Sequence, residues 1–369
     1  MKKKVLIVTS VILCATSFFM GCAQKNNERT QHKSRNTINV NESGKSTFEI
    51  PKNYKKEING ITFNIDKIEL PAGIDINALY ECTASKQKPD QKKIIDEFSK
   101  GKKIVQKESM DTTAPDGSDV VYDYRSFSDG SEINATDGNM GWSTDFTNKI
   151  SYSFNPSNMD KYDKCGEFNF ESSDDSLNRV LEQLKKYGYK LNDYEYTYFL
   201  LDYETMRKQE KHEEKVGKQL DVHSEWTVND NCYVMYINQK EQGLPIYFGN
   251  EYFMEDTDPK MMPVEGVISA KGIESIRVNN LYTFKKENRL IELINFDICV
   301  ETVANKYGEI LSDAKFVVER AKLYFVPKLN EKGKYDVKIS WLFEIKKNGS
   351  DSDKEYILID AESGKEITL

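Results

Sequence analysis

The chain has 369 residues, with 52 Lys plus Arg against 60 Asp plus Glu and a net charge of -8. An acidic surface of this kind disfavours nucleic acid and anionic lipid head groups as partners. The hydrophobic content of 38%, with 21 Tyr and 18 Phe, is sufficient for packed cores, and the length allows two ordinary domains.

The first 22 residues have the three-part layout of a secretory signal. Three lysines precede an apolar run over residues 5–20, and Gly21 and Cys22 follow it. A small residue directly before such a cysteine resembles the lipobox of bacterial lipoproteins, in which the cysteine thiol receives diacylglycerol. We therefore expect cleavage after Gly21 and lipidation of Cys22, with the protein held on the extracytoplasmic face of the cell membrane. The alternative is an uncleaved membrane helix, for which a span of about 20 residues is needed.

Residues 22–47 are expected to form a flexible stalk. They contain no aromatic residue, and their large aliphatic residues are Ile38 and Val40, so they cannot bury enough apolar surface to offset the entropy of ordering. Loss of the signal removes three lysines and takes the net charge from -8 to -11. No second apolar stretch approaches the length of a membrane span, so lipid is the anchor that we expect.

Residues 48–160 are expected to form a β-rich N-terminal domain with an antiparallel sheet. Alternating apolar residues predict a strand over 61–70, and a helix is indicated over 89–99. Further strands are expected over 120–127 and 150–154. Asp-Gly pairs at 129–130 and 137–138 indicate tight turns between the strands of this region.

Residues 161–369 are expected to contain three helices. The clearest covers 174–187, since its apolar residues fall at helical spacing and Gly188 follows as a stop. A second is indicated over 193–216, and a third begins at Asp297 and ends at Gly308.

Antiparallel strands follow the second and the third of these predicted helices. One is predicted over 231–248 with its turn at Gln242-Gly243, and a meander of strands is predicted over 321–367. Lys306-Tyr307-Gly308 also repeats Lys186-Tyr187-Gly188 at an offset of 120 residues. The expected fold class is therefore α+β, with the antiparallel-sheet N-terminal domain followed by tandem modules that each contain a helix and an antiparallel sheet.

Residues 174–369 resemble a known family. The segments "LYFVP", "ISWLFEI" and "YILIDAESGKEI" are similar to the PepSY-like modules of Gram-positive envelope proteins, including the YycH and YycI regulators, and "CYVMYINQKEQGLPIYF" is similar to the first half of such a tandem. Uncharacterised lipoproteins of gut Firmicutes share this layout. The resemblance implies a protein that binds or restrains a neighbouring protein without catalytic residues, and it gives Asp360 and Gly364 a structural role in the terminal turn.

Four cysteines follow the stalk, an even number that permits disulfides in three possible pairings outside the cytoplasm. They are Cys82, Cys165, Cys232 and Cys299. Their wide spacing contains no CxxC pair, and the last two lie in apolar segments, where a free cysteine behaves as a small buried hydrophobic residue. Because no histidine falls in a zinc-type spacing either, we expect no metal and no cofactor.

No motif of a catalytic triad, phosphate loop or dinucleotide site is present. A hydrolase with paired carboxylates stays open as a hypothesis, because acidic residues are abundant. Trp142 follows a glycine-rich turn and is the candidate binding residue of an exposed loop, the alternative being a packed anchor. We therefore expect a non-enzymatic surface lipoprotein that binds or regulates another envelope protein, or alternatively one that binds a solute or glycan.

Overall fold

The computed structural model describes residues 50–150, 161–164, 166–215, 225–248, 262–310, 314–350 and 354–368. The chain from Thr47 to Leu369 forms one compact unit. The predictions for the signal, Cys22, the stalk, Cys165 and a strand continuing to residue 154 lie outside the described residues.

Sheet A is built from strands of both ends of the unit. Its strands run in the order β1-β2-β15-β16-β17-β18, with β3 on β15, β4 on β16 and β14 on β4. β2 and β3 pair in parallel with β15, and the other pairs are antiparallel. The bounds are β1 Tyr54–Ile58, β2 Ile61–Ile65, β3 Ile68–Glu69, β4 Tyr80–Lys86, β14 Tyr282–Leu290, β15 Phe316–Leu329, β16 Tyr335–Lys347, β17 Lys354–Asp360 and β18 Glu366–Ile367.

Sheet B is antiparallel throughout. Its strands run in the order β11-β10-β12-β13-β8-β7-β6-β5, and β9 also pairs with β10. The bounds are β5 Ile104–Thr113, β6 Asp119–Phe127, β7 Glu132–Thr136, β8 Asn139–Ser143, β9 Tyr194–Leu201, β10 Cys232–Glu241, β11 Leu244–Pro245, β12 Val264–Ser269 and β13 Gly272–Val278. β5 is therefore the last strand at one end of this sheet.

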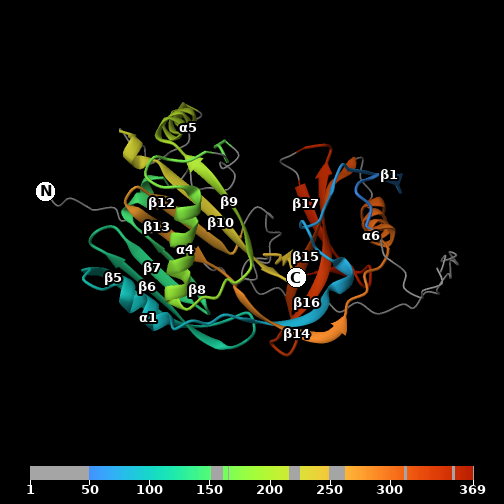
Figure 1. Cartoon of the computed structure of the whole chain (residues 1–369), viewed down its shortest axis with the longest axis horizontal. Coiled ribbons are helices and arrows are strands. Elements are labelled where there is room, and N and C mark those ends of the chain that lie inside the picture. The colour runs from blue at the N-terminus through green and yellow to red at the C-terminus, as the bar shows by residue number, and fades with distance from the viewer. Residues whose placement is uncertain are drawn as a thin grey trace. The chain divides into compact units, whose positions relative to one another are not determined.

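The α-helices of the described residues pack on the sheets (Figure 1). α4 runs along sheet B beside β10 and β13, and α6 lies against β2 and β17 of sheet A. The bounds are α1 Gln91–Phe98, α2 Asp145–Lys149, α4 Ser173–Tyr187, α5 Tyr203–Lys215 and α6 Phe296–Gly308. In α4, the Ser172 hydroxyl accepts a hydrogen bond from the amide of Asp175, and Gly188 ends the helix at a φ of 97°.

Each sheet has its own apolar core. In sheet A, α6 buries Phe296 and Val300 against Trp341 and Phe343 of β16. In sheet B, α4 buries its apolar stripe on one face. The opposite face of sheet B carries a smaller core that includes Cys232 and Trp226. Sheet strands thus supply most of the buried surface, and the helices cover them.

The sheets are joined where the chain passes from one to the other, after β4 and after β13. The amide of Gln87 donates to the carbonyl of Leu281 at 2.7 Å, and the amide of Tyr247, which follows β11, donates to the carbonyl of Phe325 at 2.7 Å. We call this region the crossing and define it by residues 87–88, 238–247 and 279–282.

The expected fold class is wrong. The protein is dominated by two large sheets and does not consist of an N-terminal sheet domain followed by helix-plus-sheet modules. Strands from before residue 160 enter both sheets, since β2 pairs with β15 and β8 pairs with β13. Periodicity shows which segments are strands but not which distant strands become neighbours, so two similar helix-to-strand passages do not establish a repeat.

Several local predictions are confirmed. α4 and Gly188 lie where the spacing predicts, and β10 and β11 turn at Gln242 and Gly243. The helix expected over 193–216 is correct only in its second part, because its aromatic beginning is strand β9 and α5 starts at Tyr203. Alternating tyrosines in this segment give a two-residue period, which suits a half-buried strand.

Candidate functional site

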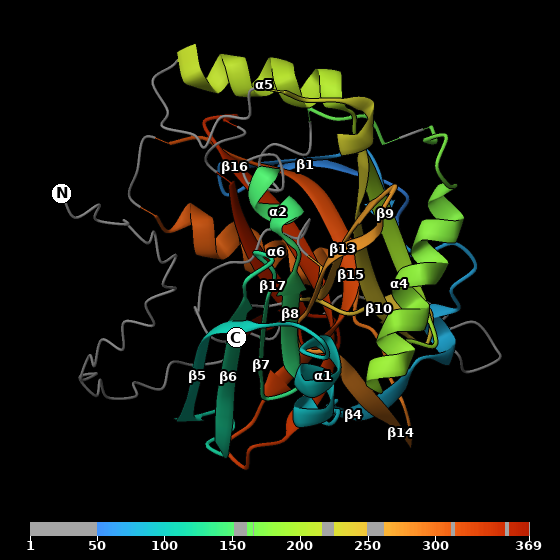
Figure 2. The ribbon, with the colours of Figure 1, turned by 90° about the vertical axis from the view of Figure 1, so that its left-hand side faces the viewer.

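Strand β5 leaves one edge of sheet B without a neighbour among the described residues. It pairs with β6 on one side only, as Figure 2 also shows. Almost every side chain of β5 is exposed, including Ile104 at 44%, Val105 at 67% and Met110 at 56%. An unpaired strand edge offers backbone donors and acceptors in a row, so this β5 edge can bind another extended chain.

The β5 edge also carries features that limit unspecific pairing. The register with β6 shifts between Ile104 and Gln106, so Val105 is the extra residue of a bulge. Lys107, Glu108 and Asp111 add charges along the strand. Such charges and bulges discourage aggregation of exposed edges, so the β5 edge favours a specific partner over indiscriminate association.

A second surface is an open groove along α4, with a volume of about 1110 Å³. Apolar side chains of Leu181, Leu184 and Leu191 lie along it. Its one aromatic lining residue, Tyr189, is only 3% exposed, and its hydroxyl donates to the carbonyl of Gly138. The charged lining residues are Glu171, Asp175, Glu182, Arg179, Lys185 and Lys190. Both charge signs are present, so this groove can hold a polar solute, but its described lining residues offer no exposed ring for stacking on a sugar.

Three polar residues share one rung of sheet B. Tyr236 of β10 lies opposite Glu265 of β12, and Glu265 lies opposite Arg277 of β13. A guanidinium nitrogen of Arg277 is 3.2 Å from Glu265 Oε2. Burial raises the pKa of Glu265, which is 4% exposed, and the charge of Arg277 opposes this shift. The Tyr236 hydroxyl is buried without a hydrogen-bond partner.

This rung is an ion pair between the buried carboxylate of Glu265 and the half-exposed guanidinium of Arg277 on the face of a sheet, and not an open acid-base centre. Tyr236 packs edge-on against Phe199, and both belong to the apolar core on this face. A group with a shifted pKa is often functional, but structural ion pairs shift pKa values in the same way. The rung therefore adds no argument for catalysis. Sequence reasoning missed it because the three residues are neighbours only through strand register.

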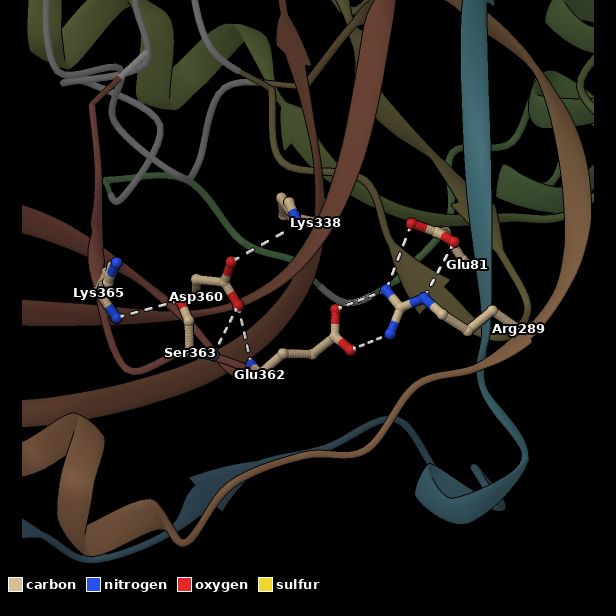
Figure 3. Close-up of polar contacts among 7 residues, drawn as sticks. All are labelled: Glu81, Arg289, Lys338, Asp360, Glu362, Ser363 and Lys365. Carbon is tan, nitrogen blue, oxygen red and sulfur yellow. Dashed lines mark hydrogen bonds and ion pairs between the residues drawn. The ribbon is translucent and has the colours of Figure 1, made fainter.

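The terminal turn that the family resemblance singled out is seen in Figure 3. The carboxylate of Asp360 accepts hydrogen bonds from the amides of Glu362 and Ser363 at 2.8 and 3.1 Å. Gly364 has a φ of 71°, and its amide donates to the carbonyl of Asp360 at 2.8 Å. The predicted structural role of Asp360 and Gly364 agrees with this geometry.

Arg289 connects this turn to strand β4, which lies much earlier in the sequence. The guanidinium of Arg289 lies between Glu81 of β4 and Glu362 of the turn, at 3.0 Å from a Glu81 oxygen and 2.7 Å from a Glu362 oxygen (Figure 3). Hydrogen bonds to Arg289 lower the pKa of Glu81. All three side chains of this pairing are partly exposed, so it is a surface contact of modest energy.

Trp142 lies within β8 and is 9% exposed. Its ring packs against Phe98 of α1, with the ring centroids 5.0 Å apart. The turn predicted at Asp137 and Gly138 joins β7 to β8, so Trp142 belongs to the hairpin strand that follows it. This is the packed arrangement that was the alternative for Trp142; a role in ligand binding stays a prediction.

The three cysteines among the described residues are free. Cys82, Cys232 and Cys299 are all buried, and burial raises the pKa of the Cys82 thiol to about 12. A thiol that resists ionisation is a poor nucleophile and a poor metal ligand. In the part of the chain that the structure describes, no three His, Cys, Asp or Glu side chains gather to hold a metal ion.

No helix among the described residues is long and apolar enough to cross a membrane.

Comparison with known proteins gives a fold but no family. No protein-family model matches the sequence, and no curated protein matches it. The crystal structure of an uncharacterised protein from Eubacterium rectale ATCC 33656 matches with a TM-score of 0.56 and 15% identity, over 86% of this chain and 94% of that chain. The chain therefore shares the fold of that protein.

A second structural match is much weaker. The C-terminal domain of Bacillus megaterium YpeB aligns with 76% of this chain and 96% of that domain at 12% identity, but with a TM-score of 0.25. A TM-score this low supports no statement about fold or function.

Proposed function

We propose that this chain is a non-enzymatic surface lipoprotein that binds another envelope protein through the β5 edge. The observation that carries the proposal is the ten-residue strand β5, which is unpaired on one side in the described structure and exposes Val105 and Met110. Addition of an extended segment to a strand edge is a common mode of protein recognition, since backbone hydrogen bonds give affinity and side chains give specificity. The partner in this proposal is an extended segment of a neighbouring envelope protein.

Anchoring through Cys22 is the second part of the proposal. It rests on the signal-like segment and on Gly21-Cys22. The wild-type protein should incorporate labelled palmitate and lack residues 1–21, and Cys22→Ala should abolish the incorporation. A wild-type protein that takes up no label and keeps residues 1–21 would instead favour the uncleaved membrane helix.

The resemblance to PepSY-like regions of Gram-positive lipoproteins stays part of the proposal as a similarity of sequence pattern. It rests on "ISWLFEI" in β16 and on the terminal turn after β17. PepSY-like regions act on neighbouring proteins, which agrees with a binding role for this chain.

Binding can be tested by crosslinking the full chain in intact cells and identifying the captured protein by mass spectrometry. Val105→Asp places a charge on the β5 edge and should reduce capture of one reproducible partner at least about tenfold, equivalent to about 1.4 kcal/mol. Val228→Asp is the matched control, because Val228 is 63% exposed but lies outside β5. Equal capture by both variants would contradict the β5 edge as the binding surface.

Solute binding is the second candidate function, because the groove along α4 has the volume and the polar lining for a small molecule. Isothermal titration with cell-wall fragments and with small charged solutes separates the two candidates. Heat of binding that disappears in Lys185→Ala but persists in Val105→Asp would favour the groove. The absence of exposed aromatic rings in the groove disfavours glycans as its ligands.

A further inference from the structure

Amide side chains replace the usual strand-to-strand hydrogen bonds at the crossing. Gln239 donates to the carbonyl of Tyr282 at 2.7 Å and accepts from its amide at 3.0 Å. Gln242 makes the same pair of bonds to the backbone of Tyr80, at 2.8 and 2.9 Å. Asn238 Nδ2 donates to the carbonyl of Ile246 at 3.0 Å. These side-chain amides satisfy backbone N–H and C=O groups close to the points where the chain passes from one sheet to the other.

Two side-chain amide oxygens at the crossing have no hydrogen-bond partner. Asn238 Oδ1 and Asn280 Oδ1 are buried without a hydrogen bond, in residues that are 5% and 6% exposed. A buried polar atom without a partner costs about 1–3 kcal/mol. Native proteins contain few such atoms, and ordered water commonly satisfies them.

Asn238 and Asn280 line the same small cavity. Gln239, Tyr247 and Tyr282 also line it, and its volume is about 10 Å³. A cavity of this size accommodates the centre of about one water molecule. The two residues that carry the unpaired oxygens therefore line the same space.

We propose that one water molecule occupies this cavity and donates one hydrogen bond to Asn238 Oδ1 and one to Asn280 Oδ1. Water suits the site because it carries two hydrogens and the site offers two acceptors. A cation is also attracted by amide oxygens, but no carboxylate of the described residues lines the cavity to balance its charge. The water completes the polar contacts of the crossing and is independent of the β5 edge.

A crystal structure of the full chain, grown with rubidium chloride present, tests the proposal. We expect one density peak at about 2.8 Å from both Oδ1 atoms, without rubidium anomalous signal. An empty cavity, a direct contact between the two asparagine amides, or an anomalous peak would each overturn it.

Asn238→Leu removes one of the two acceptors, so the peak should be lost in that variant. Asn64→Leu is the matched control, because Asn64 is an exposed strand residue of β2, and there the peak should remain. Persistence of the peak in Asn238→Leu would contradict the assigned ligands. The wild-type crystal tests the site by itself if Asn238→Leu does not fold.

Discussion

β16 of sheet A and β5 of sheet B are both long strands, but their surroundings are opposite. In β16, Trp341, Leu342 and Phe343 are at most 3% exposed, so neighbouring residues that point to opposite faces are both covered. In β5, nearly every residue is exposed on both faces. Both strands contain β-branched residues, so such residues alone do not distinguish a strand that forms the core from one that is available to a partner.

The largest change in unfolding free energy should follow from truncating a core side chain of sheet A. Trp341→Ala removes a ring that packs edge-on against Phe296 at 4.9 Å and should cost about 4 kcal/mol of unfolding free energy, measured by urea denaturation. Trp341→Phe is the control and should cost about 1 kcal/mol, because it keeps most of the ring and removes an indole N–H that has no partner. Equal losses in both variants would mean that the indole N–H matters more than the packing.

The next effect concerns close backbone approach in sheet B. A Cβ on Gly138, which has a φ of 79°, would lie 2.1 Å from the carbonyl oxygen of Gln87. Gly138→Ala should therefore cost about 3 kcal/mol, the sum of a strained backbone and a clash. Gly349→Ala is the matched control, with a φ of 69° and open space around the site, and should cost about 1 kcal/mol. Similar melting temperatures for the two variants would show that the backbone at Gln87, in the crossing, shifts at little cost to accommodate the added methyl group.

A smaller effect should depend on pH. Because burial raises the pKa of Glu265 above its ordinary value of 4.5, the folded state binds this proton more tightly than the unfolded state. The stabilisation of the folded state by protonated Glu265 is complete below about pH 4 and is lost as the pH rises through the raised pKa. Glu265→Gln should therefore stabilise the protein at pH 7 by about 1 kcal/mol, and the gain should shrink towards pH 4.5.

Thermal unfolding of Glu265→Gln at the two pH values measures this difference. Glu57→Gln, at an exposed position of β1, should leave the melting temperature almost unchanged at both. A destabilised Glu265→Gln at pH 7 would mean that the pairing with Arg277 outweighs the burial of the carboxylate.

The smallest effect should come from β5. Val105→Ser should change the unfolding free energy by less than about 0.5 kcal/mol, because its side chain is 67% exposed and packs little. Urea denaturation checks this value against the loss in Trp341→Ala. A cost above about 1 kcal/mol would place Val105 in a packed contact and weaken the case for a free edge.

Local features of the fold were open to prediction from the sequence. Leu177 and Gly188 specify the buried stripe and the end of α4 without help from the rest of the chain, whereas the start is expected at Ser173 or Asp174 and the cap is Ser172. The same holds for the turn of Asp360 and Gly364. Trp142 shows the limit, because a glycine-rich turn before a tryptophan is compatible with a loop and with a hairpin strand.

Features that depend on strand order could not be predicted. Tyr236, Glu265 and Arg277 are separated by 12 residues or more and meet only because β10, β12 and β13 are adjacent in this register. The exposure of β5 likewise follows from its place at the end of sheet B. A single sequence gives the period of a strand but carries little information on which distant strands pair.

The parallel pairing of β2 with β15 has a consequence for how the protein is made. Thr62 pairs with Val317, so β2 has no partner in β15 until almost the whole chain has been synthesised. Pairing over such a sequence distance is slow, since a very long loop must close before the contact is gained. Ile61, Phe63 and Ile65, which are at most 3% exposed in the folded protein, lack that cover in the meantime. Until β15 is made, these three apolar side chains of the nascent chain are therefore exposed to the intermolecular contacts that lead to aggregation.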